Sequence, residues 1–146
     1  MHRLRWAAAV VVATACAPGD PPETGRSASE GRSGGPLEQG RIYTSWLYQS
    51  QYQKLWDRFS PEMRQTFGSV TDLASFAGHA VQRLGAEHGS VDEHVANEKP
   101  YRVYTRTASF KRARDPVLIQ WSLADDGQVT GLVVRPAAPA PSDSVP

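Results

Sequence analysis

The chain has one cysteine among its 146 residues, Cys16, so it cannot form an intramolecular disulfide. It also lacks the short motifs of common active sites: the sequence contains no GxSxG turn, no P-loop, no HExxH and no cysteine pair. The formal net charge is +1, and removal of residues 1–16, which takes away Arg3 and Arg5 and no acid, makes it −1. This balance gives no reason to expect a nucleic-acid partner.

Long apolar runs are absent as well. The apolar stretch of residues 6–15, WAAAVVVATA, follows a short basic start and is too short to span a bilayer as a mature helix. Small residues then lead to Cys16, an arrangement that resembles a bacterial lipoprotein signal and implies a lipid anchor on this cysteine. By the same resemblance, Ala17, which follows the cysteine, favours localisation of the lipoprotein to the outer membrane. The alternative is an ordinary secretory signal cleaved after Ala17, which gives a soluble secreted protein. Both interpretations predict export to the cell envelope or beyond.

Glycine and proline are concentrated outside one central region. Residues 17–36 contain almost nothing that could form a core, so we interpret them as a disordered linker. Residues 136–146 are interpreted as a disordered tail for the same reason. About 100 residues, 37–135, are left as one folded domain, which is large enough to hold a core without disulfides.

The first half of this domain has the apolar spacing of helices. Two apolar stripes over residues 37–59 are separated by an expected break at residues 50–51. The segment YQKLWDRFSPEMRQTF then predicts a corner, because a helix ends at Phe59 and another begins at once. Ser60 is suited to cap the second helix and Pro61 to occupy its first position.

The pattern changes from helix to strand after a longer expected helix at residues 69–84, on whose exposed face we place His79. Alternation with a period of two then predicts four strands with hairpin connections, over residues 89–99, 101–112, 117–123 and 128–135. The predicted fold class is α+β: three to four N-terminal helices packed on a curved four-stranded antiparallel sheet.

Helices followed by a curved sheet resemble the nuclear transport factor two-like (cystatin-like cone) superfamily. Within it, YQKLWDRFSPEMRQTF and the closing WSLADDGQVTGLVVRP are similar to a bacterial domain of unknown function often found N-terminal to serine or α/β hydrolases. The resemblance covers residues 37–136. It implies a cone with an apolar pocket, used for ligand binding, for dimerisation or, in some members, for catalysis. This sequence leaves no room for a hydrolase after the domain.

Aromatic residues are the candidates to line such a pocket, because their rings offer an apolar body and often a polar group. The candidates are Tyr43, Trp46, Tyr52, Trp56, Tyr104 and Trp121. The alternative is that the same rings fill an ordinary core.

Other polar residues suggest little chemistry. His88 and His94 would share a face of an unbroken strand, and with Glu87 or Glu93 they could form a metal cluster. The polar surroundings favour an exposed edge instead, so we expect no metal and no cofactor. The basic run KRAR at residues 111–114 is interpreted as a solvated hairpin tip.

Three functions stay open at this point. The first is a lipid-anchored, non-catalytic module that binds a small apolar ligand or a protein partner, with a homodimer through the sheet as one form of partnership. The second is an accessory domain that acts in trans beside an exported hydrolase or peptidase. The third is a small pocket enzyme of isomerase or hydrolase type, which would need a titratable group inside an apolar site.

Overall fold

The computed structural model describes residues 34–137. The expected signal segment with Cys16, the linker before residue 34 and the tail after residue 137 lie outside this region. The elements in chain order are α2 (Pro36–Tyr48), α3 (Tyr52–Arg58), α4 (Pro61–Phe67), α5 (Val70–Leu84), β1 (Glu87–Glu98), β2 (Tyr101–Phe110), β3 (Val117–Leu123) and β4 (Val129–Pro136).

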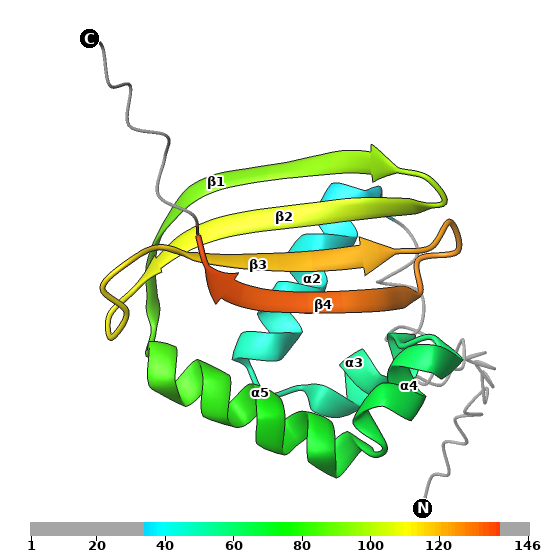
Figure 1. Ribbon diagram of the computed structural model, residues 1–146, viewed down its shortest axis with the longest axis horizontal. Helices are drawn as coiled ribbons and strands as arrows, with labels where there is room; N and C mark the ends of the chain where they lie inside the picture. The colour runs from blue at the N-terminus through cyan, green and yellow to red at the C-terminus, as the bar shows by residue number, and fades with distance from the viewer. Residues whose placement is uncertain (1–33, 138–146) are drawn as a thin grey trace, which may run out of the picture.

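The four strands form one antiparallel sheet in the order β1-β2-β3-β4. Figure 1 shows α2 crossing behind the sheet, while α5 runs along the side of β4. The predicted α+β class, with helices on a curved antiparallel sheet, is confirmed. The helices begin at Pro36, one residue before the expected start of the domain, and β4 extends to Pro136. β1 begins at Glu87, two residues earlier than expected.

The predicted corner between α3 and α4 is present, and the structure shows what it packs against. The Ser60 hydroxyl accepts a hydrogen bond from the Met63 N–H at 3.3 Å, as expected of an N-cap. The backbone of Phe59 forms a parallel bridge with Val129, and the Ser60 N–H donates to the Val129 carbonyl at 2.9 Å. The chain therefore leaves the helix at Phe59 because its extended backbone pairs with the start of β4.

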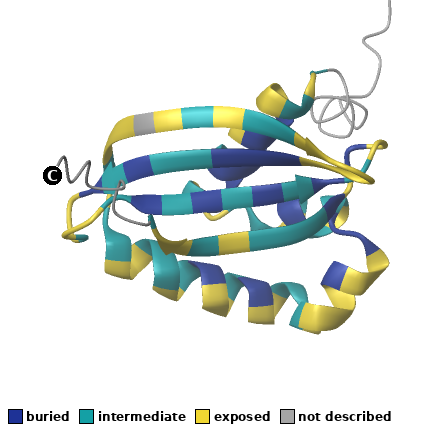
Figure 2. Cartoon of the chain, turned by 45° about the horizontal axis from the view of Figure 1, so that its top comes forward, coloured by how far each residue is buried: buried dark blue, intermediate teal, exposed yellow. Residues whose placement is uncertain are grey.

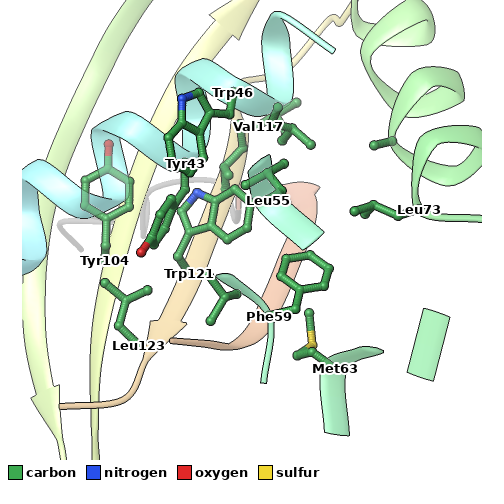
Figure 3. Close-up of a cluster of buried hydrophobic side chains, with 14 of the residues drawn as sticks. Tyr43, Trp46, Leu55, Phe59, Met63, Leu73, Tyr104, Val117, Trp121 and Leu123 are labelled. Carbon is green, nitrogen blue, oxygen red and sulfur yellow. The ribbon is translucent and has the colours of Figure 1, made fainter. Parts of the chain in front are cut away.

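The core lies between the helices and the inner face of the sheet. Figure 2 shows that the central strands and the inward faces of the helices carry the buried residues. In Figure 3, Tyr43, Leu55 and Phe59 converge with Trp121 in this space. The rings of Tyr43 and Trp121 meet edge to face with centroids 5.9 Å apart. The Tyr43 hydroxyl also donates to the Gly127 carbonyl at 2.8 Å, which ties α2 to the β3–β4 turn.

Candidate functional site

A polar cavity of about 390 Å³, here called the α2 cavity, lies between α2 and strands β1 and β2. Alternation along β2 places Tyr104 and Arg106 on the inner face, and Glu93 of β1 lies opposite Arg106 in the register. The residues that line the α2 cavity are Arg41, Thr44, Ser45, Tyr48, Gln49, Glu87, Tyr104 and Arg106.

The charged groups beside the α2 cavity pair with one another. The Arg106 guanidinium forms a close ion pair with Glu87 and also lies 3.5 Å from a Glu93 oxygen. Arg41, from α2, donates two hydrogen bonds to Oε2 of Glu93, at 2.8 and 3.1 Å, and a third, at 3.1 Å, to Oε1, the oxygen that lies nearer Arg106. Two cations and two anions therefore balance, and together they hold the polar strand β1 against β2 and α2.

Two tyrosine hydroxyls complete this network. Tyr48 donates to Glu87 at 2.8 Å and Tyr104 donates to Glu93 at 2.5 Å. Burial, reinforced by the neighbouring carboxylates, raises the pKa of Tyr48 and raises that of Tyr104 to about 12. Because each carboxylate already accepts hydrogen bonds from an arginine and a tyrosine, Glu87 and Glu93 have little unused capacity to bind a ligand or to accept a proton.

A second cavity, here called the α5 groove, has a volume of about 460 Å³. It lies between the C-terminal half of α5 and the adjoining end of β4, beside the loop that joins β2 to β3 (Figure 1). Its lining residues are Phe76, His79, Ala80, Arg83, Leu84, Ala113, Arg114, Asp115, Val117, Val134, Arg135 and Pro136.

The α5 groove has an apolar floor and a charged rim. Ala80, Leu84, Val117 and Val134 are buried or half-buried, whereas every charged lining residue is exposed. Phe76 is 52% exposed, which is high for a large apolar side chain. A concave apolar surface with a few polar groups at its mouth is the usual form of a small-ligand site.

A separate gap of only about 10 Å³ lies beneath α5, next to the groove. The two share Phe76, Ala80, Leu84 and Val134, and the gap is further lined by apolar side chains that include Leu47, Ile119 and Leu132. No charged side chain lines this gap among the described residues. The space beneath the groove floor is therefore almost filled by apolar side chains.

The six predicted pocket residues lie in three different settings. Tyr43, Trp46 and Trp121 are buried in the packed core, and only Tyr104 of the six lines the α2 cavity. Tyr52 and Trp56 are half-buried and pack against the edge of the core. The rings of Tyr43 and Trp121 pack against each other, in agreement with the core interpretation that the sequence left open.

The possible metal ligands do not converge. Two irregularities in the pairing of β1, between Glu87 and Gly89 and between Ser90 and Asp92, break the expected alternation. Glu87 and Glu93 face the arginines, while the exposed His94 lies 2.9 Å from Asp92. Within residues 34–137 no group of three or more His, Cys, Asp or Glu residues has a geometry that could hold a metal ion.

Sequence reasoning missed the residues that form the α5 groove. His79 is exposed, as predicted. The three arginines of the groove come from separate elements: Arg83 from α5, Arg114 from the β2–β3 loop and Arg135 from β4. Their spacing in the sequence does not predict that they line one cavity. The pairing of Arg106 could have been predicted, because Arg106 shares a face of β2 with Tyr104, and a cation on a mostly buried face needs a partner.

Comparison with protein-family models, with curated proteins and with solved structures found no match to this chain. The resemblance to the nuclear transport factor two-like superfamily therefore stays a prediction. No helix of the described region combines the length and the apolar character that crossing a membrane requires.

Proposed function

We propose that this chain is an exported, non-catalytic binding module that holds a small, mostly apolar ligand in the α5 groove. The α5 groove carries the proposal, since it has an apolar floor and leaves Phe76 half exposed. Its volume of about 460 Å³ lies in the range of roughly 300–1,000 Å³ that is typical of small-ligand sites.

The non-catalytic part of the proposal rests on both cavities. In the α5 groove, the titratable side chains of His79 and Asp115 are exposed and not enclosed in an apolar site. In the α2 cavity, the acids are already paired. Glu87 and Glu93 are the acids near that cavity, and each already has an arginine and a tyrosine as partners. A carboxylate whose pKa is held low by such partners is a weak general base near neutral pH.

Binding of a neutral apolar dye tests the proposal. The fluorescence of Nile red should rise on titration with the protein, and Ala80→Phe, which fills the groove floor, should weaken binding at least about tenfold. Ser75→Phe adds the same ring to an exposed position of α5 outside the groove lining, so it should bind as wild type. Equal binding by wild type and Ala80→Phe would contradict the proposal.

A membrane anchor on Cys16 belongs to the same proposal, although Cys16 lies outside the described residues. The expressed protein should enter the detergent-rich phase on temperature-induced partitioning, and Cys16→Ser should move it to the aqueous phase. A wild-type protein found in the aqueous phase, without Cys16 at its new N-terminus, would support the secretory alternative.

A further inference from the structure

We propose that the ligand of the α5 groove is a single-chain amphiphile with a carboxylate head, that is, a free fatty acid. The inference rests on the proposed function, because it names the ligand class of the same groove. Two observations support it: the charge of the rim, and the apolar floor beside it.

The rim carries an excess of positive charge. Three guanidinium groups, from Arg83, Arg114 and Arg135, line the groove, against one carboxylate, Asp115, and one imidazole, His79. With the histidine neutral, the lining has a net charge of +2. A cationic amphiphile would meet like charge at this rim, whereas an anionic one would meet complementary charge.

The three rim arginines differ from those of the α2 cavity. Arg41 and Arg106 are each engaged by carboxylates, whereas none of the rim arginines forms an ion pair with any described residue. Arg135 donates one long hydrogen bond, at 3.4 Å, to the adjacent Pro136 carbonyl. Their planar donor arrays therefore stay available, and such arrays match the two oxygens of a carboxylate.

The apolar part of the site sets the shape of the rest of the ligand. A head held at the rim leaves the chain to lie along the groove floor, where Ala80, Leu84 and Val134 offer apolar contacts. One wall of the groove is α5, and the other is β4 with the β2–β3 loop. One unbranched chain with one anionic head fits these two features.

The test compares four amphiphiles that share one chain and differ in the head: decanoate, decan-1-ol, decyl phosphate and decyltrimethylammonium. Each displaces Nile red from the full chain carrying Cys16→Ser, at concentrations below those at which micelles form. Decanoate should displace the dye at a concentration about tenfold lower than decan-1-ol, and the cationic compound should be weakest. Added salt should weaken decanoate binding and leave decan-1-ol unchanged.

Arginine variants show which residues cause the preference for decanoate over decan-1-ol. Arg83→Gln, Arg114→Gln and Arg135→Gln should each weaken decanoate about two- to fivefold, in the range of exposed ion pairs, and the triple variant should abolish the preference over decan-1-ol. Lys111→Gln is the matched control, since it removes an exposed cation of the same loop that does not line the groove. It should behave as wild type.

The outcomes separate this inference from the proposed function. If Nile red binds, responds to Ala80→Phe and is displaced equally by decanoate and decan-1-ol, the groove binds neutral ligands and the fatty-acid inference is wrong. Stronger displacement by decyl phosphate than by decanoate also overturns it, in favour of a phosphate head. If the dye is insensitive to Ala80→Phe, the proposed function itself fails.

Discussion

Gly40 of α2 lies directly against the ring of Tyr104 on β2. A Cβ atom on Gly40 would stand 2.1 Å from the Tyr104 Cγ, well inside any allowed contact. Both residues are buried, and this close approach places α2 against the sheet at the point where the Tyr104 hydroxyl reaches Glu93. A glycine inside a helix costs about 1 kcal/mol relative to alanine, so its presence here is explained by packing.

Gly40→Ala should therefore destabilise the protein despite the better helix propensity of alanine. The added methyl group must push α2 or the Tyr104 ring aside, and overpacking of this kind costs about 1–3 kcal/mol. Urea unfolding followed by tryptophan fluorescence measures the change in the free energy of unfolding. Gly78→Ala in α5 is the matched control, because its Cβ would meet the Tyr52 hydroxyl at an ordinary 3.5 Å. This control should raise stability by about 0.5–1 kcal/mol. A stabilising Gly40→Ala would contradict the packing explanation.

Thr44→Val should also destabilise the protein, although valine matches threonine in shape. The Trp121 indole N–H donates to the Thr44 hydroxyl at 2.9 Å, and that hydroxyl donates to the Gly40 carbonyl at 2.8 Å. Valine leaves the buried indole N–H without a partner, at a cost of about 1–3 kcal/mol in the free energy of unfolding. Thr44→Ser keeps the hydroxyl and should retain most of the stability in the same urea experiment. A Thr44→Val variant as stable as wild type, with a loss confined to Thr44→Ser, would show that the methyl group, rather than the hydrogen bond, matters here.

Ser60→Ala should remove the cap of α4 and lower the free energy of unfolding by about 1 kcal/mol. Ser60→Gly should destabilise the protein at least as much, because Ser60 and Met63 are buried and water does not readily replace the lost hydrogen bond. Chemical denaturation of both variants gives the comparison. A glycine variant clearly more stable than the alanine variant would show that water does reach the Met63 N–H.

Stability should fall in acid because of the α2 cavity network. The hydrogen bond from Arg41 lowers the pKa of Glu93, while burial raises that of Glu87 and is outweighed by hydrogen bonds from Arg106 and Tyr48. Both folded-state pKa values thus lie below the unfolded value of about 4.3. The two carboxylates therefore contribute their full stabilisation to the folded state above that pH. This stabilisation is lost as the pH falls through the folded pKa values.

Thermal unfolding between pH 7 and pH 3 measures this effect. We expect the melting temperature of the wild type to decrease once the pH is below about 4.5. The melting temperature of Glu93→Gln should be lower than that of the wild type at pH 7, and it should decrease less on acidification. Glu98→Gln, which removes an exposed carboxylate outside the network, controls for the change in net charge. An unchanged acid profile in Glu93→Gln would show that other groups govern acid unfolding.

Local signals predicted most of the fold. The corner at Ser60 and Pro61 follows from capping chemistry and from the geometry that proline imposes, and both act within a few residues. The break after α2 was also expected at residues 50–51, where Ser50 adopts a positive φ of 58°. Strand β1 was harder to predict, because its sequence is polar. Its acidic residues are stabilised by ion pairs with arginines from β2 and α2, which are distant in the sequence.

The sequence by itself determined the order of helices and strands, since spacing of three to four or of two residues decides which side chains can share a buried face. Only the tertiary structure decided which arginines are neutralised and which converge unpaired on the α5 groove. Arg83 and Arg135 are more than fifty residues apart, and no local rule relates their positions. Electrostatic pairing depends on distance in space, which the packing of α5 against β4 sets.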